Sequence, residues 1–411
     1  MRVAIATTGT IGDVRPFAAL ASALVAHGHE VTAVSWELYR GELEASGARF
    51  VAAGPPTTDH DISETAARAA DLQSPLRQVT ILRDFHLRDA AAHYRALCHA
   101  LAGHDLALVH GVHSLAQAAA LDAGVPLATA VFDPVLLPTA SAPPAGMPNL
   151  GTLNHLAWRI LDGVLARLNG PLHAALAEAG SKQRPQLFRG RSALLHLIAC
   201  SPAIMRVPPD LPAATHVTGY WPPATEPAAL PAAVQQFLDS GAAPVVVTFG
   251  SMAGIDTAPL IERCAAAARN NNVRVVLQDV MNASGASDAA TDGQLLRIGS
   301  LDHRRLFPRA AAVVHHGGAG TTHAVVAAGV PSLVIPHIGD QRYWAERLRL
   351  LGIAPRPIMA SEADERRLTQ RLAAALSPEM AKTARSLAGR LRAERGVEAS
   401  VRLLEETAAS A

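Results

Sequence analysis

The chain is poor in cysteine and carries almost no net charge, and each shortage excludes a class of protein. Its 411 residues include three cysteines, Cys98, Cys200 and Cys264, which stand alone and far apart. They provide neither a disulfide framework nor the ligand spacing of a zinc site, so we expect a protein of the reducing cytoplasm. A formal net charge of +1 gives no reason to expect nucleic acid as a partner.

Long apolar runs are absent as well. No segment stays apolar over the roughly 20 residues that a transmembrane helix needs. A strand-like segment begins at Val3, so we expect neither a transmembrane segment nor a signal peptide. What the chain does contain is 49% hydrophobic and 17% charged residues, the composition of a globular protein with full cores. Its length predicts two domains or one very large one.

Short apolar segments alternate with helical patterns toward both ends of the chain. Val3–Thr7 and Glu30–Ser35 are rich in β-branched residues, which is typical of buried parallel strands, and a second alternating series begins at Pro244. This alternation predicts an α/β fold with doubly wound parallel sheets. Between 55 and 87, a mixture of Pro, Thr, Asp and Ser predicts a loop with a short helix. The proline-rich segment 208–231 predicts an interdomain linker.

The most informative stretch runs from Val313 to Gln341. An apolar strand leads into two histidines, His315 and His316, and a glycine loop then leads into a helix that opens at Thr321. Glycines allow the backbone to turn tightly and to approach a ligand closely. A helix start points free N–H groups and the positive end of its dipole outward. The stretch therefore predicts an anion site suited to a phosphate or diphosphate.

Three groups of residues in this stretch form one long motif: His315-His316-Gly317-Gly318-Ala319-Gly320-Thr321-Thr322, Gly329-Val330-Pro331 and Gly339-Asp340-Gln341. This motif resembles the donor-binding signature of the UDP-glycosyltransferase family, above all its bacterial branch that glycosylates antibiotic aglycones, sterols and lipids. The resemblance implies the GT-B fold, in which two doubly wound, Rossmann-like domains face a central cleft. On that pattern we expect an N-terminal acceptor-binding domain over 1–215, a linker over 216–232, a C-terminal nucleotide-sugar-binding domain over 233–396, and a helix over 397–411 that packs back on the N-terminal domain.

The resemblance also implies the residues of the donor site. The residues expected to bind the nucleotide sugar are Gly250, Ser251, His303, His316, Gly318, Ala319, Gly320, Thr321, Asp340 and Gln341. His316 would contact the diphosphate, and Asp340 with Gln341 would hold vicinal hydroxyls of a glucose-like sugar. From the residues alone, Asp340 and Gln341 could instead cap the following helix, and Gly250 with Ser251 could form a plain turn.

Asp13 is the candidate catalytic residue. It follows the first strand at the carboxyl edge of the sheet, where ligands bind in this architecture. The segment Gly9-Thr10-Ile11-Gly12-Asp13-Val14-Arg15-Pro16 matches a family pattern that places the base for the acceptor hydroxyl. Such a base must lie within hydrogen-bond reach of the hydroxyl that becomes the nucleophile. The alternative role is a helix cap, which does not exclude catalysis. The candidate acceptor-binding residues are Ile11, Gly12, His110 and His113, although each histidine could instead be a structural residue at a strand end.

The function that the resemblance implies is inverting, metal-independent transfer of a hexose from a nucleotide-diphosphate sugar, of the UDP-glucose type, to a hydroxyl of a lipophilic acceptor. A natural-product aglycone, a sterol or a lipid would be such an acceptor. No cofactor is expected, because the nucleotide sugar is a co-substrate. Asp59-His60-Asp61 is similar to the metal-binding Asp-x-Asp of another glycosyltransferase fold, but it follows two prolines in a polar segment. We interpret it as a solvated loop.

Other functions fit parts of the same sequence. A sugar-nucleotide epimerase could share the two-domain architecture, and an inactive homologue could serve as an auxiliary partner. The presence of Asp13 and His316 argues against the inactive homologue. A dinucleotide dehydrogenase fits less well, because Gly9-Thr10-Ile11-Gly12 lacks the Gly-x-Gly-x-x-Gly spacing. The second strand also ends at Ser35-Trp36 without an acidic residue that could bind a ribose.

Overall fold

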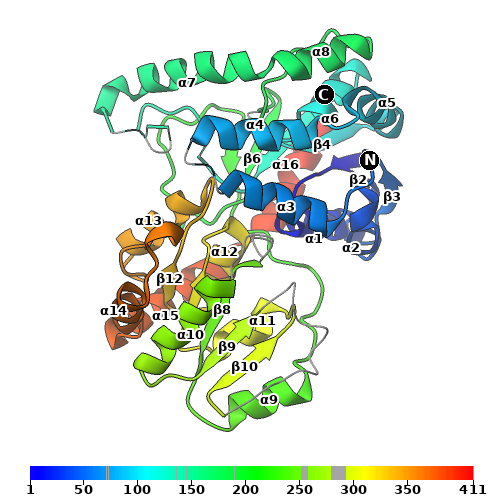
Figure 1. The fold of residues 1–411 in the computed structure, drawn as a ribbon. Coiled ribbons are helices and arrows are strands. Elements are labelled where there is room, and N and C mark those ends of the chain that lie inside the picture. Colours follow the sequence, from blue (N-terminus) through cyan, green and yellow to red (C-terminus); the bar gives the residue numbers. More distant parts are fainter. Residues whose placement is uncertain are drawn as a thin grey trace. The chain divides into compact units, whose positions relative to one another are not determined.

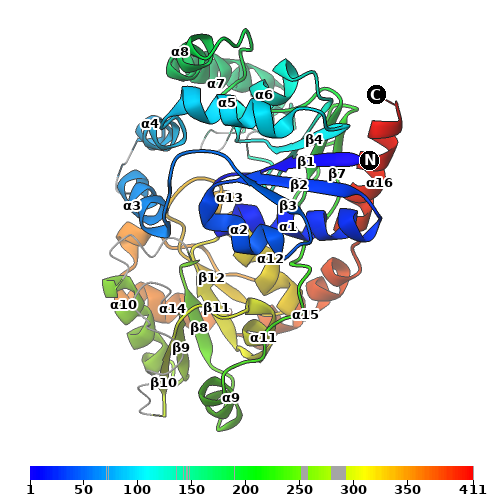
Figure 2. The ribbon, with the colours of Figure 1, turned by 90° about the vertical axis from the view of Figure 1, so that its right-hand side faces the viewer.

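The computed structural model describes residues 1–70, 72, 74–135, 137–141, 143–144, 147, 149–188, 190–250, 258–278 and 293–410. The chain forms two compact units, each built on its own sheet (Figures 1 and 2). The first unit comprises Met1–Thr65, Ser74–Thr225 and Arg395–Ala411, and the second comprises Ala66–Gln73 and Glu226–Glu394.

The first unit is organised around a seven-stranded sheet in the order β3-β2-β1-β4-β5-β6-β7. Its strands are β1 Arg2–Ala6, β2 Glu30–Ser35, β3 Arg49–Ala52, β4 Leu106–His110, β5 Leu127–Val131, β6 Leu195–Ile198 and β7 Thr215–Val217. All six pairings between these strands are parallel. Every residue of β4 is buried, as is expected where helices cover both faces of a parallel sheet. Because the strands run the same way, the segments that follow them emerge at one edge of the sheet.

Helices cover both faces of this sheet. Helices α5 Ala90–Leu101, α6 Ser114–Asp122 and α8 Gly170–Glu178 pack buried apolar residues on one face. Helices α1 Ile11–Ala26 and α16 Gly396–Ser410 pack against each other on the other face (Figure 2). The remaining helices along this part of the chain are α2 Arg40–Glu44, α3 Asp59–Ala70, α4 Pro75–His86 and α7 Asn154–Leu168.

The segment 55–87 differs from the predicted loop with one short helix, because it contains two twelve-residue helices, α3 and α4. The carboxylate of Asp61 accepts hydrogen bonds from the Thr58 backbone N–H at 2.8 Å and the Thr58 hydroxyl at 2.7 Å. This cap makes the triplet Asp59-His60-Asp61 the first turn of a helix, so the interpretation as a solvated loop was wrong. Ile62 and Ala69 are both buried, and their seven-residue spacing puts them on one face of α3.

The second unit contains a five-stranded sheet in the order β10-β9-β8-β11-β12, again with every pairing parallel. Its strands are β8 Val245–Thr248, β9 Val275–Gln278, β10 Leu295–Ile298, β11 Ala312–His315 and β12 Ser332–Val334. Its helices are α9 Ala232–Asp239, α10 Ala258–Asn270, α11 His303–Leu306, α12 Ala319–Ala328, α13 Gln341–Leu350, α14 Glu365–Ala375 and α15 Pro378–Arg392. Two parallel, helix-covered sheets confirm the predicted α/β fold class. None of the helices described is long and apolar enough to cross a membrane.

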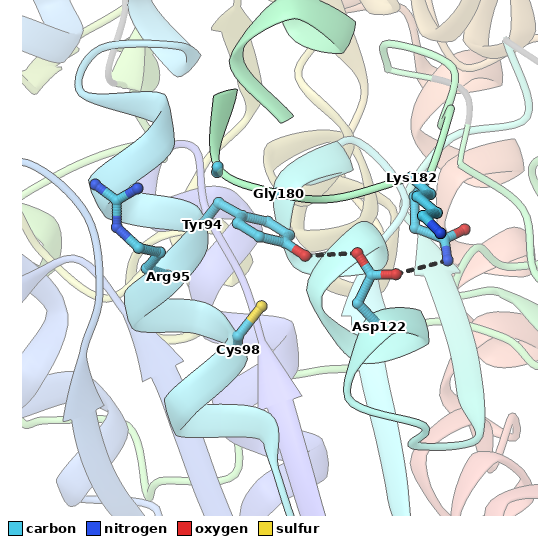
Figure 3. Close-up of a pocket in the computed structure, with 8 residues that line it drawn as sticks. Tyr94, Arg95, Cys98, Asp122, Gly180 and Lys182 are labelled. Carbon is cyan, nitrogen blue, oxygen red and sulfur yellow. Dashed lines mark hydrogen bonds between the residues drawn. The ribbon is translucent and has the colours of Figure 1, made fainter. Parts of the chain in front are cut away.

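A pocket of about 580 Å³ opens beside α5 and the end of α6 (Figure 3). One of its lining residues is Asp122, which accepts hydrogen bonds from the Tyr94 hydroxyl at 2.5 Å, the Gln183 side-chain amide at 2.8 Å and the Ser181 hydroxyl. Helix α6 starts just after β4 and runs back along the sheet, so its last residue lies at the amino edge of the strands. These bonds tie α5, α6 and the segment after α8 together at the edge opposite to the one where ligands bind, and we assign them a structural role.

Acidification is expected to destabilise the fold steeply, because several histidines are buried without charge. Burial lowers the pKa of His93, His196 and His323 to about 4. In the unfolded chain each would titrate near 6.5. Between pH 6.5 and 4 the unfolded state therefore binds protons that the folded state does not. Each such histidine then costs up to about 1.4 kcal/mol of stability per pH unit.

Urea unfolding at pH 7.0, 6.0 and 5.0 would measure this loss. The free energy of unfolding should fall progressively across the series, and replacement of His196 by Asn should make the fall shallower. A free energy of unfolding that stayed constant from pH 7.0 to 5.0 would contradict the neutral, buried state of these side chains.

Candidate functional site

Asp13 lies in the first turn of α1, at the carboxyl edge of the first sheet. Its Oδ2 accepts hydrogen bonds from the Thr10 backbone N–H at 2.8 Å and from the Thr10 hydroxyl at 3.0 Å. No hydrogen bond from the described residues reaches its Oδ1. The carboxylate is half-buried, so one oxygen caps the helix and the other remains available at the sheet edge. The helix cap therefore uses only one of the two carboxylate oxygens. Ile11 and Gly12 precede Asp13 as the first two residues of the same helix.

Of the two candidate histidines in the first unit, only His110 is brought next to Asp13. The His110 Nδ1–H donates to the carbonyl oxygen of Thr8 at 3.1 Å, which leaves Nε2 as the acceptor of a neutral ring. Burial lowers the pKa of His110, and the negative charge of Asp13 opposes that shift. His113 stands instead beside His93, with ring centroids 5.3 Å apart. Burial together with neighbouring histidines holds the pKa of His113 well below its usual value.

The sequence analysis missed Asp133, which follows β5 at the same sheet edge. Its Oδ1 accepts a hydrogen bond from the Val135 backbone N–H at 2.9 Å. Burial, and then the charge of Asp13, raise the pKa of Asp133 to about 6. The signal that could have found it was its position two residues past an apolar strand, because the carboxyl ends of parallel strands share one edge.

In the second unit, the loop from β11 to α12 brings the imidazole of His316 to the start of a helix. Gly318 is the N-cap of α12, and a Cβ added to it would stand 2.5 Å from His316 Nε2. A Cβ on Gly250, after β8, would stand 3.3 Å from His316 Cε1. The backbone of both glycines therefore lies against this ring. Ala319, Gly320 and Thr321 form the first turn of α12, whose leading N–H groups have no partner within the helix.

The two histidines of the motif have different surroundings. The Gly317 N–H donates to His315 Nδ1 at 3.1 Å, and His315 is fully buried. His316 is 8% exposed, and its Nδ1 is buried without a partner among the described residues. Burial, and then the charges of His337 and His303, lower the pKa of His316 to about 3. In the free protein His316 is therefore a neutral hydrogen-bonding group rather than a cation.

His303 and Gly250 stand at strand ends of the second sheet, whereas Ser251 lies outside the described residues. Gly250 has a positive φ of 54°, a backbone conformation that residues other than glycine rarely adopt. His303 begins α11 after β10, and its ring stacks on Phe307 with centroids 4.2 Å apart. His303 Nε2 also lies 3.0 Å from Gln278 Oε1 at the end of β9. A flat, half-buried ring thus stands at the carboxyl edge of this sheet.

Asp340 and Gln341 open α13 after β12. Asp340 Oδ2 accepts a hydrogen bond from the Trp344 indole N–H at 2.8 Å. Gln341 Oε1 accepts from the backbone N–H groups of His337 at 2.7 Å and Ile338 at 3.1 Å. These bonds orient both side chains within the loop and leave the Gln341 amide N–H groups as donors. The sequence analysis missed His337, which lies close enough to affect the titration of His316.

Sequence relatives cover nearly the whole chain. Residues 272–401 match the family described as erythromycin biosynthesis protein CIII-like, C-terminal domain. O-mycaminosyltylonolide 6-deoxyallosyltransferase of Streptomyces fradiae is 32% identical over 99% of this chain and 98% of its own length. The chain belongs to the glycosyltransferase family of that enzyme. Vancomycin aglycone glucosyltransferase of Amycolatopsis orientalis is a further relative of this glycosyltransferase, 29% identical over 98% of this chain and 97% of its own length.

Solved structures of other glycosyltransferases share the fold. The glycosyltransferase of kitacinnamycin is similar with a TM-score of 0.72 and 20% identity over 99% of this chain and 98% of its own. The glycosyltransferase VinC in complex with dTDP is similar with a TM-score of 0.68 and 20% identity over the full length of both chains. These likenesses and the two parallel sheets confirm the GT-B fold class.

Proposed function

We propose that this glycosyltransferase moves a hexose from a nucleotide-diphosphate sugar of the UDP-glucose type to a hydroxyl group of a lipophilic acceptor, with inversion and without a metal ion. The observation that carries the proposal is the contact of His316 with Gly318 at the N-cap of α12. An imidazole and the free N–H groups of a helix start then converge on one point, which suits a diphosphate.

On the donor side, the charge that develops during transfer is carried by the departing diphosphate. The N–H groups at the start of α12 and the imidazole of His316 would donate hydrogen bonds to it, and the helix dipole would favour its negative charge. The loop is closely packed, because Gly317 lies against Val334 and the backbone of Gln341, and Gly318 lies against the His316 ring. Asp340 and the amide of Gln341 would hold sugar hydroxyls, and His303 would border the nucleotide base.

On the acceptor side, Asp13 would act as general base. The acceptor hydroxyl gives its proton to Asp13 Oδ1 while its oxygen forms a bond to the anomeric carbon. The bond from that carbon to the diphosphate oxygen breaks, and the electron pair leaves with the nucleotide diphosphate. A single in-line displacement inverts the anomeric centre. Thr10 keeps the carboxylate in position through both hydrogen bonds to Oδ2.

A lipophilic acceptor is supported by exposed apolar side chains in the first unit. Leu150, Leu153, Leu156 and Ile160, at the start of α7 and just before it, are each about half exposed. Three of them, Leu153, Leu156 and Ile160, follow the spacing of one helix face. The acceptors named for two relatives are O-mycaminosyltylonolide in Streptomyces fradiae and the vancomycin aglycone in Amycolatopsis orientalis, and they support an aglycone as the acceptor of this chain.

A thermal-shift screen with UDP, dTDP, UDP-glucose and dTDP-glucose tests the donor site, with NAD as the control. A ligand that binds only the folded protein stabilises it by about 2.7 kcal/mol at one hundred times its dissociation constant. We expect a rise of several degrees with one nucleotide diphosphate and a larger rise with its sugar. No shift with any nucleotide, or a shift with NAD alone, would contradict the proposed donor. Incubation with donor alone, followed by product analysis, would reveal an epimerase by the appearance of a second sugar nucleotide.

A further inference from the structure

We propose that Trp344 is a positioning residue for the donor sugar, because its indole N–H fixes the carboxylate that would meet the sugar hydroxyls. This inference rests on the proposed function, in which Asp340 and Gln341 hold hydroxyl groups of a hexose. Trp344 has no exposed surface, so it acts on the sugar only through Asp340. Its effect would be to select donors that carry these hydroxyls over deoxygenated ones.

The side chain of Asp340 does not cap the helix that it begins. Asp340 is the N-cap residue of α13, a position where aspartate usually accepts hydrogen bonds from the first backbone N–H groups of the helix. Here the side chain makes no cap hydrogen bond, and the backbone is already helical, with φ −69° and ψ −14°. Its Oδ2 accepts instead from the indole N–H of Trp344, one turn further on, at 2.8 Å. The carboxylate is therefore directed by the indole rather than by the helix start.

The indole is packed against the helix whose start would hold the diphosphate. The Trp344 ring meets the ring of His323 edge to face, with centroids 5.1 Å apart and an interplanar angle of 74°. His323 lies on α12, and its Nδ1–H donates to the carbonyl oxygen of Ala319 at 2.7 Å. Ala319 belongs to the first turn of the same helix. Contacts between side chains thus connect the first turn of α12 to the carboxylate of Asp340.

A backbone contact joins the same two regions independently. Gly317, in the loop from β11 to α12, has a positive φ of 92°, and a Cβ added to it would stand 3.0 Å from the carbonyl oxygen of Gln341. The strands that lead into the two regions are paired in parallel, with His315 opposite Val334. The start of α13 is therefore held against the proposed diphosphate site, and Trp344 sets where the Asp340 carboxylate stands within it.

A carboxylate held in this way distinguishes sugars by their hydroxyl groups. A carboxylate oxygen accepts hydrogen bonds, so it pairs with a hydroxyl group and not with a C–H group in the same place. A polar group that is left without its partner in the complex costs free energy, which disfavours the deoxygenated sugar. This discrimination depends on a fixed oxygen, because a freely rotating side chain can turn to water instead. Loss of the indole N–H should therefore weaken binding of the sugar and not of the nucleotide.

Isothermal titration calorimetry separates the contribution of the sugar from that of the nucleotide. We define the sugar contribution as the dissociation constant of the nucleotide diphosphate divided by that of its glucose derivative, for the nucleotide that the donor screen selects. Trp344→Phe keeps an aromatic ring and removes the N–H, and it should lower this ratio about five- to tenfold, the equivalent of one typical hydrogen bond. Affinity for the nucleotide diphosphate alone should stay unchanged. Equal weakening of both ligands would indicate a merely structural role and would overturn the proposal.

A double-mutant cycle shows whether Trp344 acts through Asp340. Asp340→Ala loses no cap hydrogen bond and should also lower the sugar contribution. Addition of Trp344→Phe to that variant should have no further effect, because the carboxylate that the indole directs is already absent. Additive losses would contradict this route. Trp221→Phe is the matched control, since Trp221 is buried in the first unit and its indole N–H donates to the Thr218 hydroxyl at 3.2 Å. It should leave both dissociation constants unchanged.

NMR of ¹⁵N-labelled tryptophan tests the contact in the free protein. The chain has four tryptophans, and Asp340→Ala should move one indole N–H signal, the one that is missing from Trp344→Phe. If all indole signals stay in place in Asp340→Ala, the proposal is overturned, whether or not Trp344→Phe folds. A donor screen in which no nucleotide binds, with the indole signal moved as expected, would count against the proposed function instead.

Discussion

Replacement of Asp13 by asparagine is expected to lower kcat by about 10²- to 10⁴-fold, the usual contribution of a positioned general base. Asparagine has an acceptor oxygen that can retain both hydrogen bonds from Thr10, so α1 keeps its cap. The amide does not take up a proton, so the variant loses only the proposed role of the carboxylate as general base. Steady-state kinetics with a hydroxylated acceptor would measure the rate, and the donor thermal shift would measure binding.

Two comparisons make this result specific. Asp13→Ala should lose the cap as well, at a cost of about 1 kcal/mol in stability. Asp122→Asn removes a carboxylate at the opposite sheet edge and should leave kcat unchanged. If Asp13→Asn bound donor and turned over at the wild-type rate, Asp13 would be a cap only.

Replacement of Gly318 by alanine is expected to reduce kcat/KM for the donor by about 10- to 100-fold, as a displacement of roughly 1 Å does in a positioned site. The backbone of Gly318 has φ −63° and ψ 148°, which alanine adopts without strain. The new Cβ would stand 2.5 Å from His316 Nε2, so the imidazole must move. The substitution thus displaces the proposed phosphate contact without removing it.

Gly389, near the C-terminal end of α15, provides a matched glycine-to-alanine control. A Cβ there meets no heavy atom within 4 Å. Because alanine is the better helix former by up to about 1 kcal/mol, Gly389→Ala should be neutral or slightly stabilising with unchanged kinetics. Wild-type donor affinity in Gly318→Ala would show that His316 does not contact the diphosphate.

The strands of both units were the most predictable part of the fold, because strands buried on both faces are continuous apolar runs. Glu30–Ser35 has the predicted bounds. Helix α3 was missed because its few buried residues stand among polar ones that resemble a loop in composition. Strand β7 has only three residues and lies within a proline-rich segment, which is too short to show the alternation of apolar and polar residues that predicts a strand.

Site residues that lie within one short motif were predictable from the sequence. Site residues that come together only because separate strands end at one sheet edge were not. Asp13 and the His316 loop lie within short motifs that the chain presents in one piece. Asp133 and His337 become neighbours of Asp13 and of His316 only because parallel strands end together. The contact of Gly318 with the His316 ring also depends on the rotation of an imidazole, which no spacing of residues specifies.

The packing of α16 against α1 has a consequence for the order of folding. His29 Nε2 lies 2.8 Å from Glu405 Oε1, and Gly396 contacts the backbone at Gly219 and Tyr220 so closely that a Cβ would not fit. During synthesis, residues 226–394 must leave the ribosome before α16 can cover α1. Until then the apolar face of α1 that α16 covers stays exposed. The contacts between α1 and α16 join residues far apart in the sequence, so they form late. Nascent chains of this protein should need protection from aggregation until synthesis has passed Ser410.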